Sequence, residues 1–181
     1  GKKINIYNYI VDHSLRDNSS DEAKLVNRNL KTIGFNSKVL KWKGKKPLSN
    51  IQSTARNIRY SLIFKQCKKD KVSSIFTAHH QDDLYENFFI RIFRGSGLNG
   101  ISSFNSTVFK NYNNINIIRP LLNIDKDELI YISKKVFNFY IKDPSNKERI
   151  FKRVRLRKLI SESKKEGLDF NKLKLTINNL R

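Results

Sequence analysis

Residues 72–93 read VSSIFTAHHQDDLYENFFIRIF, and this stretch contains the pattern that decides the fold. Residues 72–78 predict a strand that belongs to a sheet. Residues 79–93 predict a helix, and the GSG run at 95–97 is typical of a helix end. A strand that continues directly into a helix is the building unit of a parallel sheet with crossover helices.

The same alternation of strand and helix continues on both sides of this stretch. Further strands are predicted at residues 4–11, 35–42 and 115–118, and further helices at 20–33, from 49 onward, at 125–137 and up to about 165. Ser49 and Gln52 have the spacing of a capping box, so Ser49 is the expected start of its helix. Residues 102–114 are polar, and we expect them to be irregular.

This pattern predicts an α/β fold: a Rossmann-like parallel sheet with crossover helices, followed by a basic helical extension. We expect a domain at residues 1–141 and the extension at residues 142–181. Ligands of such sheets bind beyond the carboxyl ends of the strands. The places of interest are therefore residues 12–13, residues 77–83 and Arg119.

The composition narrows the class of partner. Lys plus Arg is 37 and Asp plus Glu is 16, which gives a formal net charge of +21. Such an excess favours a polyanion, with nucleic acid as the first candidate, although an AT-rich coding genome explains part of the lysine content. The single cysteine, Cys67, excludes an internal disulfide framework and a four-cysteine zinc site. We find neither a secretory signal nor an apolar run of about 20 residues, so we expect a cytoplasmic protein outside the membrane.

The most informative candidate site lies at the start of the helix predicted at residues 79–93. His79, Asp82, Asp83 and Glu86 follow each other at i, i+3, i+4 and i+7, so a helix places them on one face. Such a cluster can hold Mg²⁺, hold an ammonium group or accept a proton. A solvated acidic first turn explains the same residues. A zinc site is weaker, since no second histidine-rich element exists.

Two further clusters suggest nucleotide binding. Asp12 and His13 directly follow the strand predicted at 4–11, where they can orient a nucleotide or simply cap a turn. Arg56 and Arg59 flank an apolar helix stripe, and paired guanidinium groups suit phosphate. Exposed arginines on a helix surface are the alternative.

Two basic segments suggest contact with RNA. The segment RGSGLNG at 94–100 lets backbone N–H groups approach a ligand, although one of its glycines is explained equally well as a helix end. A basic helix can track an RNA backbone, or it can be a solvated helix of a lysine-rich protein. Its cationic residues are Arg149, Lys152, Arg153, Arg155, Arg157 and Lys158.

Taken in this order, the motifs resemble those of the tRNA(Ile)-lysidine synthetases, a family of the N-type ATP-pyrophosphatase (PP-loop) superfamily. The resemblance covers nearly the whole chain, and its specific pieces are the segments VDHSLR and HHQDD. The matching segments are VDHSLR at 11–16, ARNIRY at 55–60, TAHHQDD at 77–83 with Glu86, RGSG at 94–97, RPLL at 119–122, and DPSN at 143–146 followed by RVRLR at 153–157.

The resemblance implies a ligase that takes part in tRNA processing and modification. Such an enzyme uses ATP to adenylate the C2 oxygen of the wobble cytidine in a CAU-anticodon tRNA(Ile) and releases pyrophosphate. The ε-amine of free L-lysine then displaces AMP and forms lysidine. The expected cofactors are ATP and Mg²⁺, and a homodimer is a further expectation.

The resemblance also implies roles for individual residues. Asp82, Asp83 and Glu86 would bind the cationic lysine, and one of them or His79 would take a proton. Mg²⁺ has no assigned ligand beyond Asp82 as a candidate. The expected ATP contacts are Asp12, His13, Arg56 and Arg119, and the expected tRNA contacts are Arg94, Arg153, Arg155, Arg157 and Lys158.

One family signature, Ser-Gly-Gly-x-Asp-Ser after the first strand, is absent from these residues, and the chain contains no methionine. We therefore expect a catalytic domain without its first strand and phosphate loop, which would be inactive by itself. The alternatives are a non-catalytic tRNA-binding remnant and a tRNA-thiolating relative. The three acidic groups argue against the first alternative, and Cys67 as the only cysteine argues against the second.

Overall fold

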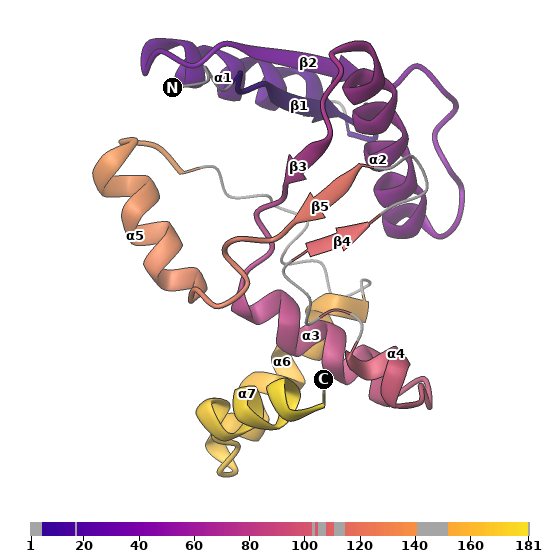
Figure 1. Cartoon of the computed structure of the whole chain (residues 1–181), viewed down its shortest axis with the longest axis vertical. Helices are drawn as coiled ribbons and strands as arrows, with labels where there is room; N and C mark the ends of the chain where they lie inside the picture. Colours follow the sequence, from indigo (N-terminus) through magenta and orange to yellow (C-terminus); the bar gives the residue numbers. More distant parts are fainter. Residues whose placement is uncertain are drawn as a thin grey trace. The chain divides into compact units, whose positions relative to one another are not determined.

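A computed structural model of the chain describes residues 5–16, 18–102, 104, 108–110, 115–140 and 152–180. The chain divides into two compact units, Gly1–Ser73 and Ser74–Arg181, which we call unit 1 and unit 2. Figure 1 labels the elements of both units.

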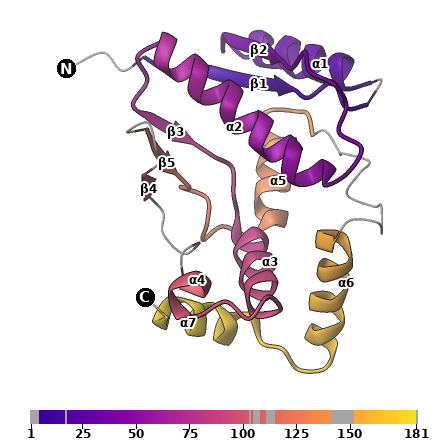
Figure 2. The same cartoon turned by 90° about the vertical axis from the view of Figure 1, so that its right-hand side faces the viewer.

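Unit 1 is a strand–helix–strand–helix segment. It contains β1 (Asn8–Asp12), α1 (Ser19–Thr32), β2 (Ser37–Lys41) and α2 (Ile51–Lys69). The strands β1 and β2 are parallel, with Ile10 opposite Val39. Both helices contact β1, and α1 also contacts β2 (Figure 2). The residues that follow β1 are thereby placed at the carboxyl end of a parallel pair.

Unit 2 contains a second, three-stranded sheet. Its elements are β3 (Ser74–Phe76), α3 (Gln81–Ile92), α4 (Leu98–Ser102), β4 (Val108–Lys110), β5 (Asn116–Ile118), α5 (Lys126–Val136), α6 (Lys152–Lys165) and α7 (Phe170–Asn179). The strand order is β3-β5-β4, in which β3 and β5 are parallel and β4 is antiparallel to β5. Helix α3 therefore begins at the carboxyl end of a parallel strand.

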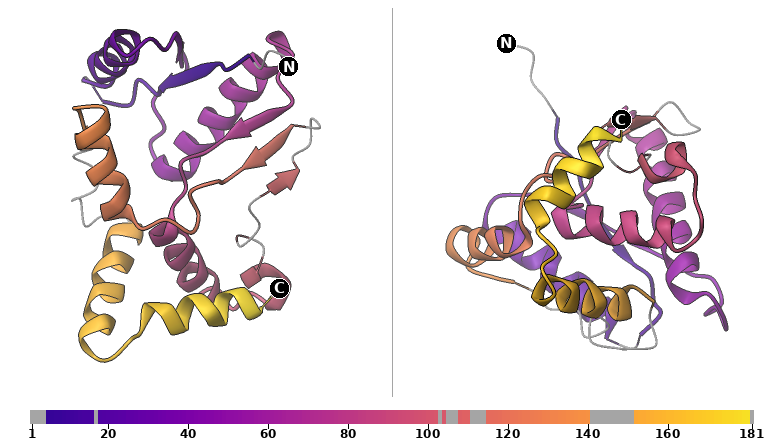
Figure 3. Two further views of the ribbon diagram at one scale, coloured as in Figure 1. Left: turned by 60° about the vertical axis from the view of Figure 1, so that its left-hand side comes forward. Right: turned by 90° about the horizontal axis from the view of Figure 1, so that it is seen from below.

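The core of unit 2 joins α3 to the last helix of the chain, and Figure 3 shows α6 and α7 beside α3. Tyr85 stacks on Phe170 with 5.0 Å between ring centroids, and its hydroxyl donates to the Phe170 carbonyl oxygen at 3.2 Å. The buried members of this cluster are Leu84, Tyr85, Phe88, Phe104, Leu122, Leu173 and Ile177. Helices α6 and α7 are thus part of the same compact unit as α3.

The predicted α/β class is confirmed, because both units pair their strands in parallel and connect them through helices. Two local predictions are wrong. Part of the stretch expected to be irregular forms β4, a three-residue strand without enough length for a recognisable alternation. Helix α2 begins at Ile51 instead of Ser49, since Asn50 precedes it in the left-handed conformation that asparagine tolerates.

The predicted domain boundary at residues 141 and 142 lies outside the described residues and stays a prediction. The strand predicted at residues 4–11 is observed at Asn8–Asp12. Among the described residues, no helix has the length and apolar character needed to cross a membrane.

Candidate functional site

The carboxylate cluster lies at the N-terminus of α3, directly after β3. Asp82 and Asp83 occupy the first helical turn, where the helix dipole favours negative charge. The backbone N–H of His80, the residue before the helix, donates to Asp83 Oδ2 at 3.1 Å. The His80 ring also approaches Asp83, with 3.4 Å between Nε2 and Oδ2. Asp83 is therefore tied to the local backbone and held in one orientation.

Glu86, one turn further on, is buried and paired with α6. Its side chain is 2% exposed, and the Nε–H of Arg157 donates to its Oε1. Arg153 Nη1 lies 3.8 Å from both Asp83 Oδ1 and Glu86 Oε2. Burial raises the pKa of Glu86, and the hydrogen bond and charge of Arg157 offset only part of this shift. The two arginines hold Asp83 and Glu86 in one network.

Asp82 differs from its two neighbours in its surroundings. It is half-buried, and burial raises its pKa although the nearby His80 and Lys126 oppose the shift. It accepts no hydrogen bond from the part of the chain that the structure describes. Asp82 is consequently a half-buried carboxylate whose two oxygens are not used by the described part of the fold.

The prediction that His79 shares the α3 face with the carboxylates is wrong, because the helix begins only at Gln81. His79 Nδ1 instead lies 2.9 Å from Thr77 Oγ1, and the ring packs edge-on against Phe104 at 5.5 Å between centroids. Arg119 packs on the same phenyl ring, with its guanidinium carbon 4.3 Å from the centroid. Its Nη1 donates to the Phe104 carbonyl oxygen at 3.3 Å. Phe104 thus brings His79 and Arg119 together at the end of the parallel pair β3–β5.

In unit 1, Asp12 is 2% exposed and organises the turn that leads into α1. Asp12 Oδ1 accepts from the backbone N–H of Ser14 and the hydroxyl of Ser19, both at 2.8 Å. Its Oδ2 accepts from the Ser20 hydroxyl at 2.6 Å. Burial alone would raise the pKa of Asp12, but the three hydrogen bonds outweigh it and lower the pKa. This geometry favours the turn-capping alternative for Asp12.

Replacing Asp12 by alanine is expected to destabilise unit 1 by about 2–3 kcal/mol, because three donors lose a charged acceptor. Since the folded-state pKa is lowered, the contribution of Asp12 is present above its ordinary value of 3.8 and is lost as the pH falls below it. Urea denaturation followed by the fluorescence of Trp42, the single tryptophan and a unit 1 residue, measures both effects.

The control for this prediction is Asp21→Ala, which removes an exposed aspartate that pairs with Lys24 at 3.1 Å. The control should change the free energy of unfolding by less than about 0.5 kcal/mol. Equal destabilisation by the two substitutions would contradict the capping role of Asp12.

His13 lies beside Arg59, the second arginine of the predicted phosphate-binding pair. Arg59 Nε and Nη2 both lie 3.4 Å from His13 Nε2. Burial and the charge of Arg59 lower the pKa of His13, and Asp12 opposes this in part. Arg56 instead lies over the ring of Tyr60, 5.0 Å from the centroid. The sequence already marks Arg59 by its helical spacing. Its pairing with His13 could not be predicted, because it depends on how α2 packs on β1.

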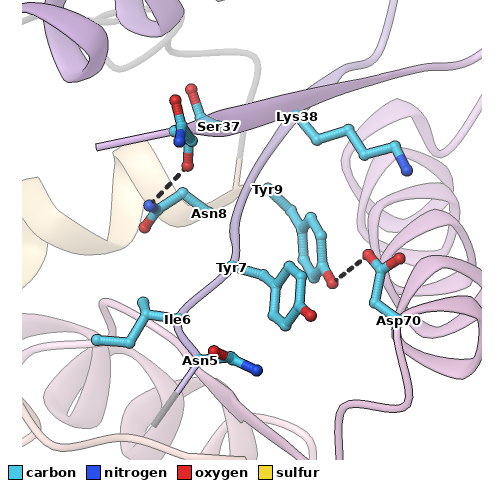
Figure 4. Close-up of a pocket in the computed structure, with 9 residues that line it drawn as sticks. Asn5, Ile6, Tyr7, Asn8, Tyr9, Ser37, Lys38 and Asp70 are labelled. Carbon is cyan, nitrogen blue, oxygen red and sulfur yellow. Dashed lines mark hydrogen bonds between the residues drawn. The ribbon is translucent and has the colours of Figure 1, made fainter. Parts of the chain in front are cut away.

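A hollow of about 550 Å³ opens elsewhere in unit 1 (Figure 4). The Tyr9 hydroxyl donates to Asp70 Oδ2 across it at 2.8 Å. Its lining residues are 5–9, 36–38 and Asp70, and they include none of the predicted site residues. The hollow lies at the amino ends of β1 and β2, and ligands of parallel sheets bind at the carboxyl ends. We therefore do not place the functional site there.

The remaining predicted RNA contacts lie on exposed surface of unit 2. Arg94 is exposed next to Gly95, whose positive φ of 66° ends the α3 segment. Arg155 and Lys158 are exposed on α6, and Lys158 pairs with Glu162 at 3.6 Å. The structure thus divides the predicted basic face of α6: these two residues face outward, whereas Arg153 and Arg157 contact the carboxylates of α3.

Comparison with known proteins gives a family model and several relatives. The model, described as a PP-loop domain, matches residues 2–163. The chain is 39% identical over 150 residues to the tRNA(Ile)-lysidine synthase of Orientia tsutsugamushi (strain Boryong), a match that covers 83% of this chain and 33% of that protein. It is 36% identical over 163 residues to the tRNA(Ile)-lysidine synthase of Rhodopseudomonas palustris, covering 90% of this chain and 46% of the other.

A solved structure shows the same fold. The U34-tRNA thiolase NcsA from Methanococcus maripaludis, solved with its 4Fe-4S cluster, superposes with a TM-score of 0.75 over 96% of this chain and 59% of its own length. At 16% identity, this similarity concerns the fold alone. The chain spans between a third and a half of the length of the two curated relatives named above.

Proposed function

This chain belongs to the PP-loop domain family, and from that membership we propose that it forms the catalytic part of a tRNA(Ile)-lysidine synthase. The reaction has two steps. ATP adenylates the C2 oxygen of the wobble cytidine in a CAU-anticodon tRNA and releases pyrophosphate. The ε-amine of lysine then forms a bond to C2, while the bond from C2 to the adenylate oxygen breaks and AMP leaves.

The observation that carries the proposal is the acidic cluster at the start of α3 in a chain of net charge +21. Carboxylates repel a phosphate backbone, so their concentration here suits a cationic small substrate better than RNA. Asp82, with its open acceptor positions, is the residue we assign to the lysine ammonium group. Asp83 and Glu86 are kept as further candidates for contact with the lysine, although Arg153 and Arg157 neutralise part of their charge.

The ε-ammonium group of lysine must first lose a proton to solvent to become a neutral nucleophile. After the nitrogen has bonded to C2 it must lose a second proton, which needs an acceptor. Asp82 and His79 are the two candidates that receive it, because each is half-buried at the carboxyl end of β3. Extruding the cytidine costs little, since it lies in a single-stranded loop.

In unit 1 we assign ATP contacts to His13 and Arg56, and Asp12 would act by shaping the turn that carries His13. In unit 2 we assign one to Arg119. Arg119 would act from a fixed position, because Phe104 holds its guanidinium group. Arg59, next to His13, is an addition to this set.

Mg²⁺ stays an expectation. The described residues contain no cluster of three His, Cys, Asp or Glu side chains that could hold a metal ion. Mg²⁺ in nucleotide enzymes takes one or two carboxylates and completes its shell with water and phosphate oxygens. Asp82 would supply such a carboxylate, and the ion would neutralise charge on the pyrophosphate.

The thiolating alternative is disfavoured by the position of Cys67. This residue is fully buried on α2, and burial, helped by the nearby Asp70 charge, raises the pKa of its thiol. Sulfur transfer requires an accessible thiolate.

The proposal is tested on the complete gene product that contains these residues. ATP, labelled lysine and a CAU-anticodon tRNA transcript should together give label in the tRNA, and nuclease digestion should give cytidine heavier by lysine minus water. Omission of ATP should abolish the label. Binding of the tRNA without lysine transfer would contradict the proposal and favour the non-catalytic remnant, and transfer of sulfur would favour the thiolase.

The surface arginine Arg94 is proposed to contact the tRNA backbone. Its replacement by alanine is expected to flatten the dependence of log affinity on log salt by about 0.7–0.9, since one phosphate contact disappears. The loss should be similar for all tRNAs. Lys24→Ala, which removes an exposed cation paired with Asp21, is the control and should leave the slope unchanged. A loss confined to one tRNA would contradict backbone contact.

A further inference from the structure

The hollow at the amino ends of β1 and β2 carries two tyrosines, a lysine and a carboxylate on one side of the strand pair (Figure 4). Tyr9 lies opposite Lys38 in the register of the pair, so both side chains leave the sheet on the same face. Tyr7 stacks beside Tyr9, with 6.4 Å between ring centroids and an interplanar angle of 18°. Asp70, which follows α2, lines the hollow from the helix side. Aromatic, cationic and anionic groups therefore meet in one place.

Asp70 stands at the C-terminal end of α2, where the helix dipole disfavours a carboxylate. Its Oδ2 accepts from the Gln66 side-chain amide and from the Tyr9 hydroxyl, both at 2.8 Å, and these bonds lower the pKa of Asp70. Its Oδ1 accepts no hydrogen bond from the residues that the structure describes. The anchoring of Tyr9 to α2 thus uses one oxygen of a charged carboxylate and leaves the other available to a ligand.

Tyr7 and Lys38 are exposed, and the described part of the fold makes little use of them. Tyr7 is 48% exposed, and its ring contact is the stack on Tyr9. Lys38 forms neither a hydrogen bond nor an ion pair with a described residue, although its charge acts on Asp70 together with that of Lys69. An exposed aromatic ring beside cations is the arrangement on which proteins stack unpaired bases and hold the phosphate that follows.

We propose that this hollow binds an unpaired nucleotide of an RNA strand. The base stacks on Tyr7, its exocyclic amino group donates to Asp70 Oδ1, and the phosphate pairs with Lys38. The net charge of +21 favours a strand over a free nucleotide, because every further phosphate of a strand meets further cations. The site lies at the opposite end of β1 from Asp12, and it does not rest on the lysine-transfer reaction.

The test is photo-crosslinking of the complete gene product to a short single-stranded adenosine oligomer that carries one azidoadenosine. Mass spectrometry of the tryptic peptide 4–16 then locates the modified residue, which separates this hollow from basic surfaces elsewhere. We expect modification within residues 5–9. Modification confined to residues outside 5–9, 36–38 and 70 would overturn the proposal.

Competition identifies the ligand. Unlabelled adenosine oligomer should suppress the modification at a lower concentration than uridine oligomer, because uracil has no exocyclic amino group, and an RNA duplex should not suppress it. Equal suppression by AMP and by the adenosine oligomer would assign the hollow to a free nucleotide. Equal suppression by duplex and single strand would overturn the proposal, since a paired base cannot stack on Tyr7.

Substitutions test the three contacts separately. Tyr7→Ala should raise the oligomer concentration for half-maximal modification by about 5–150-fold, and Tyr7→Phe, which keeps the ring, should stay within about twofold. Lys38→Ala should flatten the dependence of log affinity on log salt by about 0.7. Asp70→Asn keeps an acceptor for Tyr9 and should remove the preference for adenosine over uridine.

The matched control is Tyr131→Ala, which removes a tyrosine on α5 that is 63% exposed and lies outside the hollow. It should leave the half-maximal concentration unchanged. Urea denaturation followed by Trp42 fluorescence checks that unit 1 stays folded in each variant. An unchanged half-maximal concentration in a folded Tyr7→Ala protein would overturn the proposal.

Discussion

Replacing Asp82 by asparagine is expected to lower the rate of lysine transfer by about 10²–10⁴-fold and to leave the affinity for tRNA within about twofold. The substitution keeps the shape of the side chain and removes its charge. Asp82 accepts no hydrogen bond from the described residues, so the fold loses only the interaction of its charge with the N-terminus of α3. The charge that disappears is the one we assign to the substrate ammonium group. Label transfer and filter binding with the same tRNA measure the two quantities.

A matched control for this prediction exists in the same unit. Asp127 also lies in the first turn of a helix, α5, and no role in the reaction is assigned to it. Asp127→Asn should retain the rate of the unaltered protein. If Asp82→Asn weakened tRNA binding as much as it slowed transfer, the carboxylate would serve the structure of the tRNA-binding surface instead of the lysine.

Replacing Arg157 by alanine is expected to destabilise unit 2 by about 3 kcal/mol, because it leaves Glu86 as a buried carboxylate without its closest counter-charge. We take the lower end of the range for buried pairs, since the Arg157 side chain is 33% exposed and water partly replaces it. Hydrogen exchange of the α3 and α6 amides, read by mass spectrometry, reports the opening of this unit. Trp42 fluorescence reports unit 1, which should stay unchanged.

The direction of the pH dependence follows from the raised pKa of Glu86. Between the ordinary value of 4.5 and the raised folded-state value, the folded protein binds more protons than the unfolded one. The contribution of Glu86 to stability therefore declines as the pH rises through this window. Without Arg157 the pKa rises further, so the decline should become larger and extend to higher pH.

Two variants separate this pair from a general effect of charge. Lys158→Ala removes the neighbouring cation on α6, whose partner Glu162 is exposed, and should cost less than about 1 kcal/mol. Glu86→Gln combined with Arg157→Ala should recover part of the loss, because no buried charge remains. Equal destabilisation by Lys158→Ala and Arg157→Ala would contradict the role of the buried pair.

The features predicted correctly from the sequence are strands and helix starts, which depend on residues that are neighbours in the chain. Residues 4–11 and 72–78 contain strands because apolar and β-branched side chains lie together there. Helix α5 is predicted from Asp125, which caps it by accepting from the Asp127 N–H at 2.7 Å. Asp82 and Asp83 were expected at the start of a helix for the same local reason. The predicted roles of these residues remain proposals.

What the sequence could not predict depends on contacts between distant segments. Glu86 and Arg157 are 71 residues apart, and no periodicity connects them. From the sequence, all basic residues of α6 were therefore equal candidates for contact with RNA. Packing brings two of them, Arg153 and Arg157, against the carboxylates of α3. Asp12 is a different case, because its partners Ser14, Ser19 and Ser20 are close in sequence and the capped turn was one of the two alternatives for it.

The packing of α7 on α3 has a consequence for engineering. A shortened gene that stops near residue 141 would delete Leu173 and Ile177, which cover Tyr85 and its neighbours, together with the guanidinium group on Glu86. The product would expose the apolar face of α3 and leave the Glu86 carboxylate without its counter-charge, and it would precipitate. A fragment meant to keep the acidic cluster packed as it is here therefore needs to include both α6 and α7.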